Sequence, residues 1–487
     1  MKASRPRHPK GLRILFFTEM WERFSYYGMR ALLVLYLVEG LEVPREDALK
    51  IYALYTALVY LTPIAGGYLA DRWLGRHRAV LTGGIVMAMG HFAMALPEYL
   101  HLALGLLVIG NGFFKPNIST LVGGLYDHDD PRRDGGFTIF YMGINLGALL
   151  SPLICGTLGE KVGWHYGFAA AGVGMVIGVL VFSLGHRRLR ADLREQTLAT
   201  FDLRDWLAVI ATSLASLATA ALTVYNWPAT ERFWHGLAHW QRGLLILILL
   251  APLFYRRRNS PRAPLNARDF RHILAILILG VFTVVFWMGF EQAGGTMNLF
   301  ALENTDRSVF GWEIPASNFQ SLNPLLILIL AVPFSVLFMV TDQTRFGLST
   351  PAKMANGLII LGLGFALLAV ANERAEAVGR VSPLWLVGVY LLHTVGELFL
   401  SPVGLAMVTR LAPLQLASLM MGVWFTGVAI ANYLAGTLES TLRQYDIALY
   451  WFLVSASFGA GLLLLMLTPL LKRLMRDDPK NHPGTST

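Results

Sequence analysis

The sequence predicts an all-α polytopic membrane protein, built as two six-helix bundles plus an inserted two-helix hairpin. Its 487 residues are 55% hydrophobic and only 15% charged, too apolar for a soluble protein of this size. Apolar stretches of about 20 residues recur along the whole chain, each long enough to cross a hydrocarbon core of roughly 30 Å. Runs such as Ile273 to Phe286 are continuously apolar and do not alternate, which favours helices over a β-barrel.

The apolar runs number about fourteen, and their order gives the topology. Their centres lie near residues 26, 60, 87, 110, 148, 174, 214, 247, 282, 329, 361, 395, 428 and 459. Basic residues cluster in alternate connections, first before residue 14, then at 72–78 and at 132–133. Because cytoplasmic loops carry an excess of Lys and Arg, these connections and the N-terminus are expected in the cytoplasm.

An inserted hairpin follows from the same rule. Basic clusters at 187–194 and 256–271 both belong on the cytoplasmic side, so an even number of spans separates them. Two fit, from Trp206 to Tyr225 and from Trp240 to Tyr255. The basic residues at 472–480 place the C-terminus inside as well. The predicted parts are therefore a first bundle (1–190), the hairpin and its linkers (191–268), a second bundle (269–474) and a disordered cytoplasmic tail (475–487).

Composition also disfavours several functions. The net charge is +9, but the basic residues lie at the edges of spans rather than on one face. Nucleic acid is therefore not an expected partner, whereas the lipid bilayer is. Cys155 is the only cysteine, which leaves no disulfide or cysteine-ligated metal within the chain. Metalloprotease, P-loop and nucleophile-elbow motifs are not found, so neither an enzyme nor an ATP-driven pump is expected, and no cofactor is predicted. The N-terminal apolar segment carries charges and is too long for a signal peptide, so it is interpreted as a retained first span.

A polar run from Glu19 to Arg30 lies inside the first span. On a helix, Glu19, Arg23, Tyr26 and Arg30 fall at i, i+4, i+7 and i+11 and form one stripe. Charges inside a membrane face a protein-lined or water-filled cavity and mark functional sites. The stripe is therefore predicted to line a cavity.

A second stripe opens the second bundle, from Phe286 to Asn298. Trp287, Glu291 and Asn298 again share one helix face, with Gly294 between them. A carboxylate here opposite Arg30 would neutralise both charges. Arg30 and Glu291 are predicted to form a gating pair.

Two further charges stand alone within spans, Lys115 and Glu397. Burying either alone would cost several kcal/mol, so they are predicted to pair with each other or with substrate. Snorkelling of Lys115 to an interface is the alternative. Asn145 and Asn323 add neutral donors and acceptors at mid-span, with hydrogen bonding between helices as the alternative role.

Aromatic side chains are candidates for the cavity wall: Tyr26, Tyr27, Tyr60, Trp287 and Trp424. For each one alone, core packing or an interfacial belt is the competing interpretation. The loop from Gly67 to Arg78 resembles the signature of the major facilitator superfamily, whose fold is two six-helix bundles. A purely topogenic basic loop is the alternative there.

From about Gly11 to Lys472 the chain resembles the proton-dependent oligopeptide transporter family, a branch of the major facilitators. A complete Glu-x-x-Glu-Arg-Phe-x-Tyr-Tyr-Gly run stands at Glu19 to Gly28. Family-like runs also occupy Phe113 to Asn117, Tyr141 to Pro152, Gly163 to Phe168 and Gly396 to Pro402. The resemblance implies proton-driven import of di- and tripeptides by alternating access.

The resemblance also assigns roles to residues. Proton coupling would fall to Glu19, Glu22, Arg23 and Glu291. Peptide binding would fall to Arg30 and Lys115 at the carboxylate, to Glu397 at the amino terminus, to Asn145 and Asn323 beside them, and to Tyr26, Tyr27, Tyr60, Trp287, Trp424 and Ser401 around them. Arg30 with Glu291 and Lys115 with Glu397 would be the gating pairs. Protons are the expected coupling ion, and peptide-like drugs are further expected ligands.

Two departures point to a bacterial member. Mammalian relatives carry a proton-handling His on the second span, but residues 51–71 contain none, so coupling would rest on carboxylates. The loop from Ala371 to Pro383 lacks the large outer domain of animal relatives. The expected setting is the bacterial inner membrane, with both termini cytoplasmic and a monomer as the working form. The alternatives are a relative that carries another solute such as nitrate, a peptide sensor without transport, and a membrane-embedded enzyme.

Overall fold

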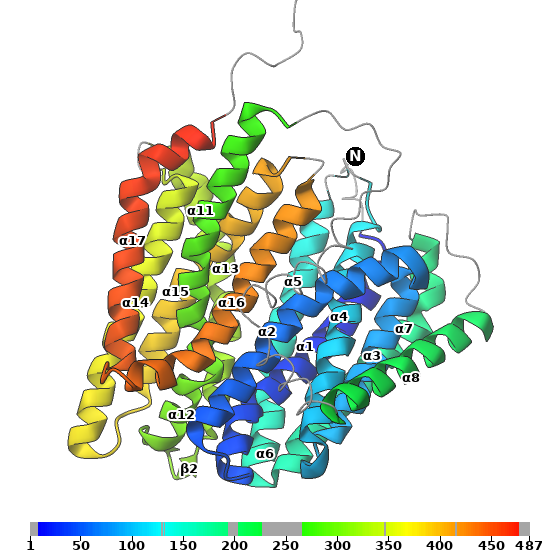
Figure 1. The fold of residues 1–487 in the computed structure, drawn as a ribbon, viewed down its shortest axis with the longest axis horizontal. Coiled ribbons are helices and arrows are strands. Elements are labelled where there is room, and N and C mark those ends of the chain that lie inside the picture. Colours follow the sequence, from blue (N-terminus) through cyan, green and yellow to red (C-terminus); the bar gives the residue numbers. More distant parts are fainter. Residues whose placement is uncertain are drawn as a thin grey trace, which may run out of the picture. The chain divides into compact units, whose positions relative to one another are not determined.

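The computed structural model describes residues 8–127, 130, 132–192, 203–225, 265–344, 347–413 and 416–476. Long helices occupy thirteen of the predicted spans (Figure 1). The second hairpin helix, from Trp240 to Tyr255, and the tail after residue 476 lie outside the described residues. Ten helices of the described part are long and apolar enough to cross a membrane.

The described residues of the first half of the chain are helical almost throughout. Its elements are α1 (Gly11–Leu35), η1 (Tyr36–Gly40), α2 (Arg45–Leu69), η2 (Ala70–Leu74), α3 (Arg76–Ala93), η3 (Pro97–Tyr99), α4 (Leu100–Gly123), α5 (Arg133–Ser151), η4 (Pro152–Gly156), α6 (Thr157–Lys161) and α7 (Trp164–Asp192). α8 (Leu203–Tyr225) follows and matches the first predicted hairpin helix. The run from α5 through η4 to α6 is a single long span with a π-helical turn at Pro152.

The second half contains one broken span and five others. Its elements are α11 (Ala267–Phe290), η5 (Glu291–Gly294), α12 (Thr296–Glu303), β1 (Ser308–Val309), β2 (Trp312–Glu313), η6 (Ala316–Ser321), α13 (Leu322–Asp342), α14 (Thr350–Val378), α15 (Leu384–Leu411), α16 (Ala417–Arg443) and α17 (Leu449–Leu474). β1 and β2 pair antiparallel in a small hairpin.

Local sequence signals set the start of α11. The Asn266 Oδ1 accepts a hydrogen bond from the Asp269 backbone N–H at 2.9 Å, and the Asp269 carboxylate accepts one from the Asn266 N–H at 3.0 Å. This reciprocal capping satisfies two backbone donors that the first turn of a helix leaves without partners. The helix α11 therefore begins at Ala267, directly after this cap.

The described chain divides into two compact units by internal contacts. The first comprises residues 1–22, 62–141 and 172–264, and the second comprises 23–61, 142–171 and 265–487. The second unit thus contains the later part of α1, the first part of α2 and the end of α5 together with the second half. The two predicted bundles, 1–190 and 269–474, stay a prediction, because the two compact units do not follow their boundaries.

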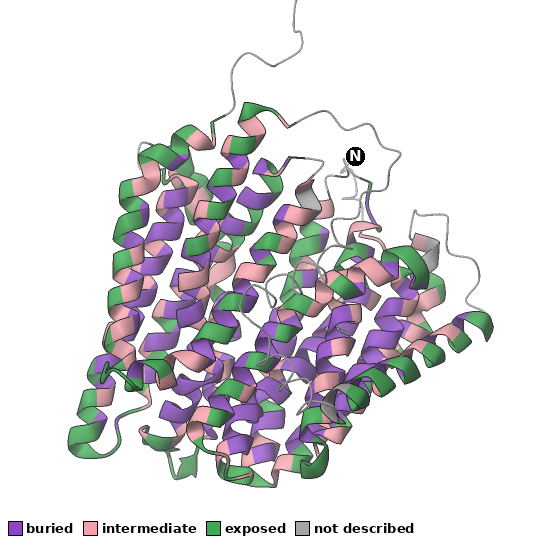
Figure 2. Cartoon of the chain, in the orientation of Figure 1, coloured by how far each residue is buried: buried purple, intermediate pink, exposed green. Residues whose placement is uncertain are grey.

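In the first unit, α8 packs on α3 and α4. The Arg78 Nε donates to the Asp205 carboxylate at 2.7 Å, and the Thr82 and Thr212 hydroxyls lie 2.9 Å apart. Asp205 is buried, whereas Leu207, on the opposite face of α8, is exposed. Exposed positions recur along this helix (Figure 2). The hairpin helix is therefore fixed to this unit by polar contacts and keeps an apolar face outward, as a lipid-facing helix does.

In the second unit, α14 packs against α15 and α17, and α11 packs against α16. Leu358, Leu361 and Phe365 of α14 are fully buried in this packing. Leu462 and Met466 of α17 are exposed. Exposed positions follow the outer side of this helix (Figure 2). At the lower end of this unit in Figure 1 lie α6, α12 and β2.

Candidate functional site

The Arg30 guanidinium is the centre of a buried cluster in the second unit. Its Nη2 forms an ion pair with the Glu291 Oε2, and its Nε donates to the Tyr52 hydroxyl at 2.7 Å. Arg30 is 8% exposed and Glu291 is 2% exposed. The predicted partners thus lie in contact, each offsetting the cost of burying the other. Their role as a gate stays a prediction.

Tyr52 was not among the candidates from the sequence, although it completes this cluster. It is 1% exposed and lies on α2. A buried tyrosine hydroxyl usually forms a hydrogen bond, so a tyrosine within an apolar span was the one indication in the sequence. The α2 sequence contains Tyr52, Tyr55, Tyr60 and Tyr68, and hydropathy alone does not distinguish among them.

The predicted stripe from Trp287 to Asn298 does not lie on one continuous helix. α11 ends at Phe290, and residues Glu291–Gly294 form a 3₁₀ turn before α12 begins. The break needs a residue without a side chain at Gly294, because a Cβ there would overlap the Tyr52 hydroxyl and lie 3.2 Å from the Arg30 Nε. Asn298, on α12, donates to the Ala31 carbonyl of α1 at 2.8 Å.

Glu397 lies in a second polar cluster of the same unit. The Asn323 amide donates to the Glu397 Oε2 at 2.9 Å and lies 3.1 Å from the Thr394 hydroxyl. Glu397 is 8% exposed. Ser401 is half-buried one turn further along α15. Asn323 therefore holds the Glu397 carboxylate, an interaction between helices that the sequence allowed as its alternative role.

The remaining second-unit candidates lie on several helices. Asn145 on α5 is 5% exposed. Tyr26 and Tyr27 meet edge to face with centroids 5.1 Å apart, and the Arg30 Cζ lies 5.8 Å from the Tyr27 ring centroid.

Trp287 and Tyr60 are half-buried, and Trp424 is buried at 6% exposure. The Arg23 Cζ lies 5.6 Å from the Tyr26 ring centroid. Lining of a peptide site by these rings stays a prediction.

Three candidates belong to the first unit: Glu19, Glu22 and Lys115. Glu19 and Glu22 are buried on α1. The Asn111 amide on α4 lies 3.5 Å from the Glu22 Oε1, and Lys115 follows Asn111 by four residues on the same helix. Asn111 was not a candidate from the sequence. Because Lys115 and Glu397 belong to different units, their pairing stays a prediction.

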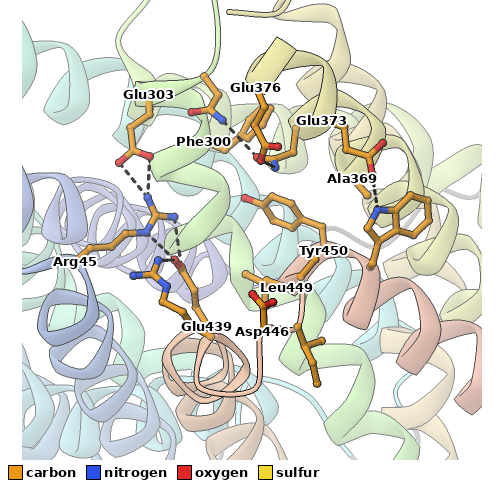
Figure 3. Close-up of a pocket in the computed structure, with 16 residues that line it drawn as sticks. Arg45, Phe300, Glu303, Ala369, Glu373, Glu376, Glu439, Asp446, Leu449 and Tyr450 are labelled. Carbon is orange, nitrogen blue, oxygen red and sulfur yellow. Dashed lines mark hydrogen bonds and ion pairs between the residues drawn. The ribbon is translucent and has the colours of Figure 1, made fainter. Parts of the chain in front are cut away.

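A charged network surrounds Arg45 at the lower end of the second unit (Figure 3). The Arg45 Nη1 donates to both Glu303 oxygens at 3.0 and 2.7 Å, and its Nε donates to the Glu439 Oε1 at 2.9 Å. A cavity of about 550 Å³ adjoins it, with Tyr450 and Trp451 among its lining residues. Arg45 begins α2, Glu303 ends α12 and Glu439 lies near the end of α16, and none of the three was a candidate from the sequence.

A second contact at this end joins α6 to η6. The Glu160 carboxylate accepts hydrogen bonds from the Ala316 and Ser317 backbone N–H groups at 2.7 and 2.9 Å. The buried Arg307 lies 3.8 Å from Glu160 and 2.8 Å from Glu313. A hydrogen bond from Lys161, with the charge of Arg307, lowers the pKa of the Glu313 carboxyl. Segments of the first half are thus tied to the second half here.

Comparison with known proteins identifies the family. A model of the POT family matches residues 77–453. The uncharacterized transporter YclF of Bacillus subtilis is 38% identical, over 96% of this chain and 95% of its own. The peptide transporter YePEPT of Yersinia enterocolitica is 35% identical, over 96% of each chain.

Solved structures match equally well. A variant of the peptide transporter POT in complex with alafosfalin is 36% identical, covers 98% of both chains and has a TM-score of 0.79. This match confirms the predicted major facilitator fold of a multi-pass membrane protein, while the count of fourteen helices stays a prediction. The chain belongs to the POT family, the proton-dependent oligopeptide transporters.

Proposed function

We propose that this protein is a proton-coupled symporter that imports di- and tripeptides by alternating access. The observation that carries the proposal is the pair of buried clusters in the second unit. One contains the Arg30 guanidinium and the other contains the Glu397 carboxylate held by Asn323. A binding site for a zwitterion needs one charged group of each sign. Relatives named as peptide and di-/tripeptide transporters support a peptide as the zwitterion that binds here.

Proton coupling would use carboxylates that change partners. A carboxylate beside a guanidinium stays ionised, and it takes a proton more readily once that partner moves away. Glu291 beside Arg30 has this arrangement, and Glu19, Glu22 and Arg23 form the second proposed group. The protein would need no cofactor other than the proton and would catalyse no covalent reaction.

The proposed setting is the bacterial inner membrane, with both termini in the cytoplasm and a monomer as the working unit. In that orientation the lower end of the second unit faces outward. Peptide-like drugs would share the peptide site. A relative that carries another small solute such as nitrate is the alternative, because the POT family fold alone does not fix the cargo.

The test is uptake of labelled dialanine into proteoliposomes under an imposed inward proton gradient, with and without a protonophore. Glu22→Gln and Lys115→Ala are expected to abolish concentrative uptake. The exposed residues Glu98 and Lys50 supply matched controls, Glu98→Gln and Lys50→Ala, which should transport like the wild type. Peptide binding without gradient-driven uptake would indicate a sensor. Neither binding nor uptake would indicate another cargo.

A further inference from the structure

The helix break η5 contains a buried amide to which no role has yet been assigned. Gln292 follows Glu291 directly and is 1% exposed. Its Nε2 donates to the Ala435 carbonyl of α16 at 3.0 Å and to the Met288 carbonyl of α11 at 3.3 Å. Its Oε1 accepts a hydrogen bond from the Thr296 hydroxyl, at the start of α12, at 2.7 Å.

These three bonds join α11, α12 and α16 at the break. The last carbonyls of a helix have no partner within that helix, and inside a membrane an unsatisfied carbonyl is costly. Met288 lies in the last turn of α11, where the Gln292 amide supplies a donor. The same amide ties α11 and α12 to α16, so the break has one defined position against its neighbour.

The position of the break determines where the Glu291 carboxylate lies. Glu291 is the first residue of η5 and contacts Arg30, while Gly294 closes the same turn against Tyr52. A shift of the turn along α16 would therefore move the carboxylate away from the guanidinium.

We propose that Gln292 is a positioning residue, whose amide fixes η5 against α16 and so holds Glu291 on Arg30. This inference rests on the proposed proton-coupled transport for its effect on uptake. The side-chain type is specific, since only an amide of this length offers two donors and one acceptor. Gln292→Glu keeps the size and the acceptor for Thr296, but places an oxygen against two carbonyl oxygens.

Several ionisable groups lie within electrostatic reach of Glu291. They are Arg30, Tyr26 and Tyr27 of α1, Tyr52 and Tyr60 of α2, and Glu397 of α15. Arg30 is the only cation among these groups. A carboxylate that separates from it binds a proton at higher pH.

The transport experiment compares gradient-driven dialanine uptake with dialanine counterflow across a pH series. For Gln292→Glu we expect driven uptake to fall about tenfold and the pH of half-maximal uptake to rise by about one unit, the size expected when a carboxylate loses one charge-assisted hydrogen bond. Counterflow should stay within about twofold of the wild type. Gln343→Glu, at an exposed position, is the matched control. A folded Gln292→Glu with a wild-type pH profile, or with equal loss of both activities, would overturn the inference.

A second experiment needs no transport. Thermal unfolding of purified Gln292→Leu, Glu291→Gln and the double variant forms a double-mutant cycle. If Gln292 acts through Glu291, the two changes will be non-additive, whereas Gln343→Leu with Glu291→Gln will be additive. Additivity of the Gln292 cycle would refute the positioning role. A wild type without proton-driven uptake would refute the proposed function, and this cycle would still decide the role of Gln292.

Discussion

At the scale of single residues, the Arg30 cluster depends on hydrogen bonds from three helices. Arg30 on α1 contacts Glu291 beyond α11 and Tyr52 on α2. Removing one member of a buried ion pair leaves the other charge unpaired, at a cost of about 3–5 kcal/mol. The tyrosine contact is weaker, and it can be removed without leaving a charge alone. A substitution at Tyr52 is therefore expected to perturb the cluster less than one at Arg30 or Glu291.

Tyr52→Phe removes one hydroxyl and keeps the ring. Because hydrogen bonds to charged groups contribute about 1.5–3 kcal/mol, we expect the free energy of unfolding to fall by that amount. The measurement is denaturation of the purified protein in detergent. Tyr445→Phe, at a residue 71% exposed, should leave stability unchanged. Equal stability of Tyr52→Phe and the wild type would contradict the inferred strength of this contact.

The sequence predicted the charged pair but not its neighbours. Arg30 and Glu291 are recognisable because a lone charge inside an apolar span requires a partner. Arg45, Glu303 and Glu439 are also charged, but they lie at or near helix ends, where water solvates them. The sequence pattern therefore does not require a protein partner for them. Tyr52 and Gln292 are uncharged, and hydropathy does not show which polar groups they meet. The pairing of Lys115 with Glu397 stays a prediction.

At the scale of elements, hydropathy predicted long helices well, and it failed at interruptions. A span must supply about 20 apolar residues, so its existence is visible in the sequence. The four-residue turn η5 leaves the apolar content unchanged and contains no proline, so the Trp287 to Asn298 stripe was predicted on one helix. Gly294 and Gly295 were the only local signal, and the need for glycine at Gly294 depends on Tyr52 of another helix.

Gly294→Ala tests the close approach of η5 to α2. The added Cβ would overlap the Tyr52 hydroxyl, so we expect lower thermal stability and at least tenfold less gradient-driven dialanine uptake. Combining it with Tyr52→Phe should restore part of both losses, because the nearest clashing atom is then removed. Gly280→Ala is the matched control on α11, since no other atom lies within 4 Å of its Cβ position. Gly294→Ala with wild-type stability and uptake would show that the turn relaxes freely.

At the scale of the whole molecule, the make-up of the second unit indicates how transport would proceed. Parts of α1, α2 and α5, and the whole of α6, belong to the same unit as the second half. The contacts that join them are Arg30 with Glu291, Asn298 with Ala31, Arg45 with Glu303 and Glu439, Glu160 with Ser317, and Ser321 with Leu149. Alternating access requires one half to move against the other, so in the proposed cycle these contacts would break.

Weakening one of these contacts should therefore make the residues of another, distant contact more accessible to water. Ser321 is 5% exposed, and its hydroxyl donates to the Leu149 carbonyl. In a Cys155→Ala background, Ser321→Cys supplies a single thiol at this buried position. Its rate of labelling with a membrane-impermeant maleimide reports how often the position opens. Adding Arg45→Gln removes both carboxylate contacts of Arg45, and each 1.4 kcal/mol lost would raise the open population about tenfold. We expect labelling to accelerate about tenfold, whereas Arg374→Gln, at an exposed position, should leave it unchanged. Labelling of equal rate in all three proteins would show that the Arg45 contacts do not hold this end closed.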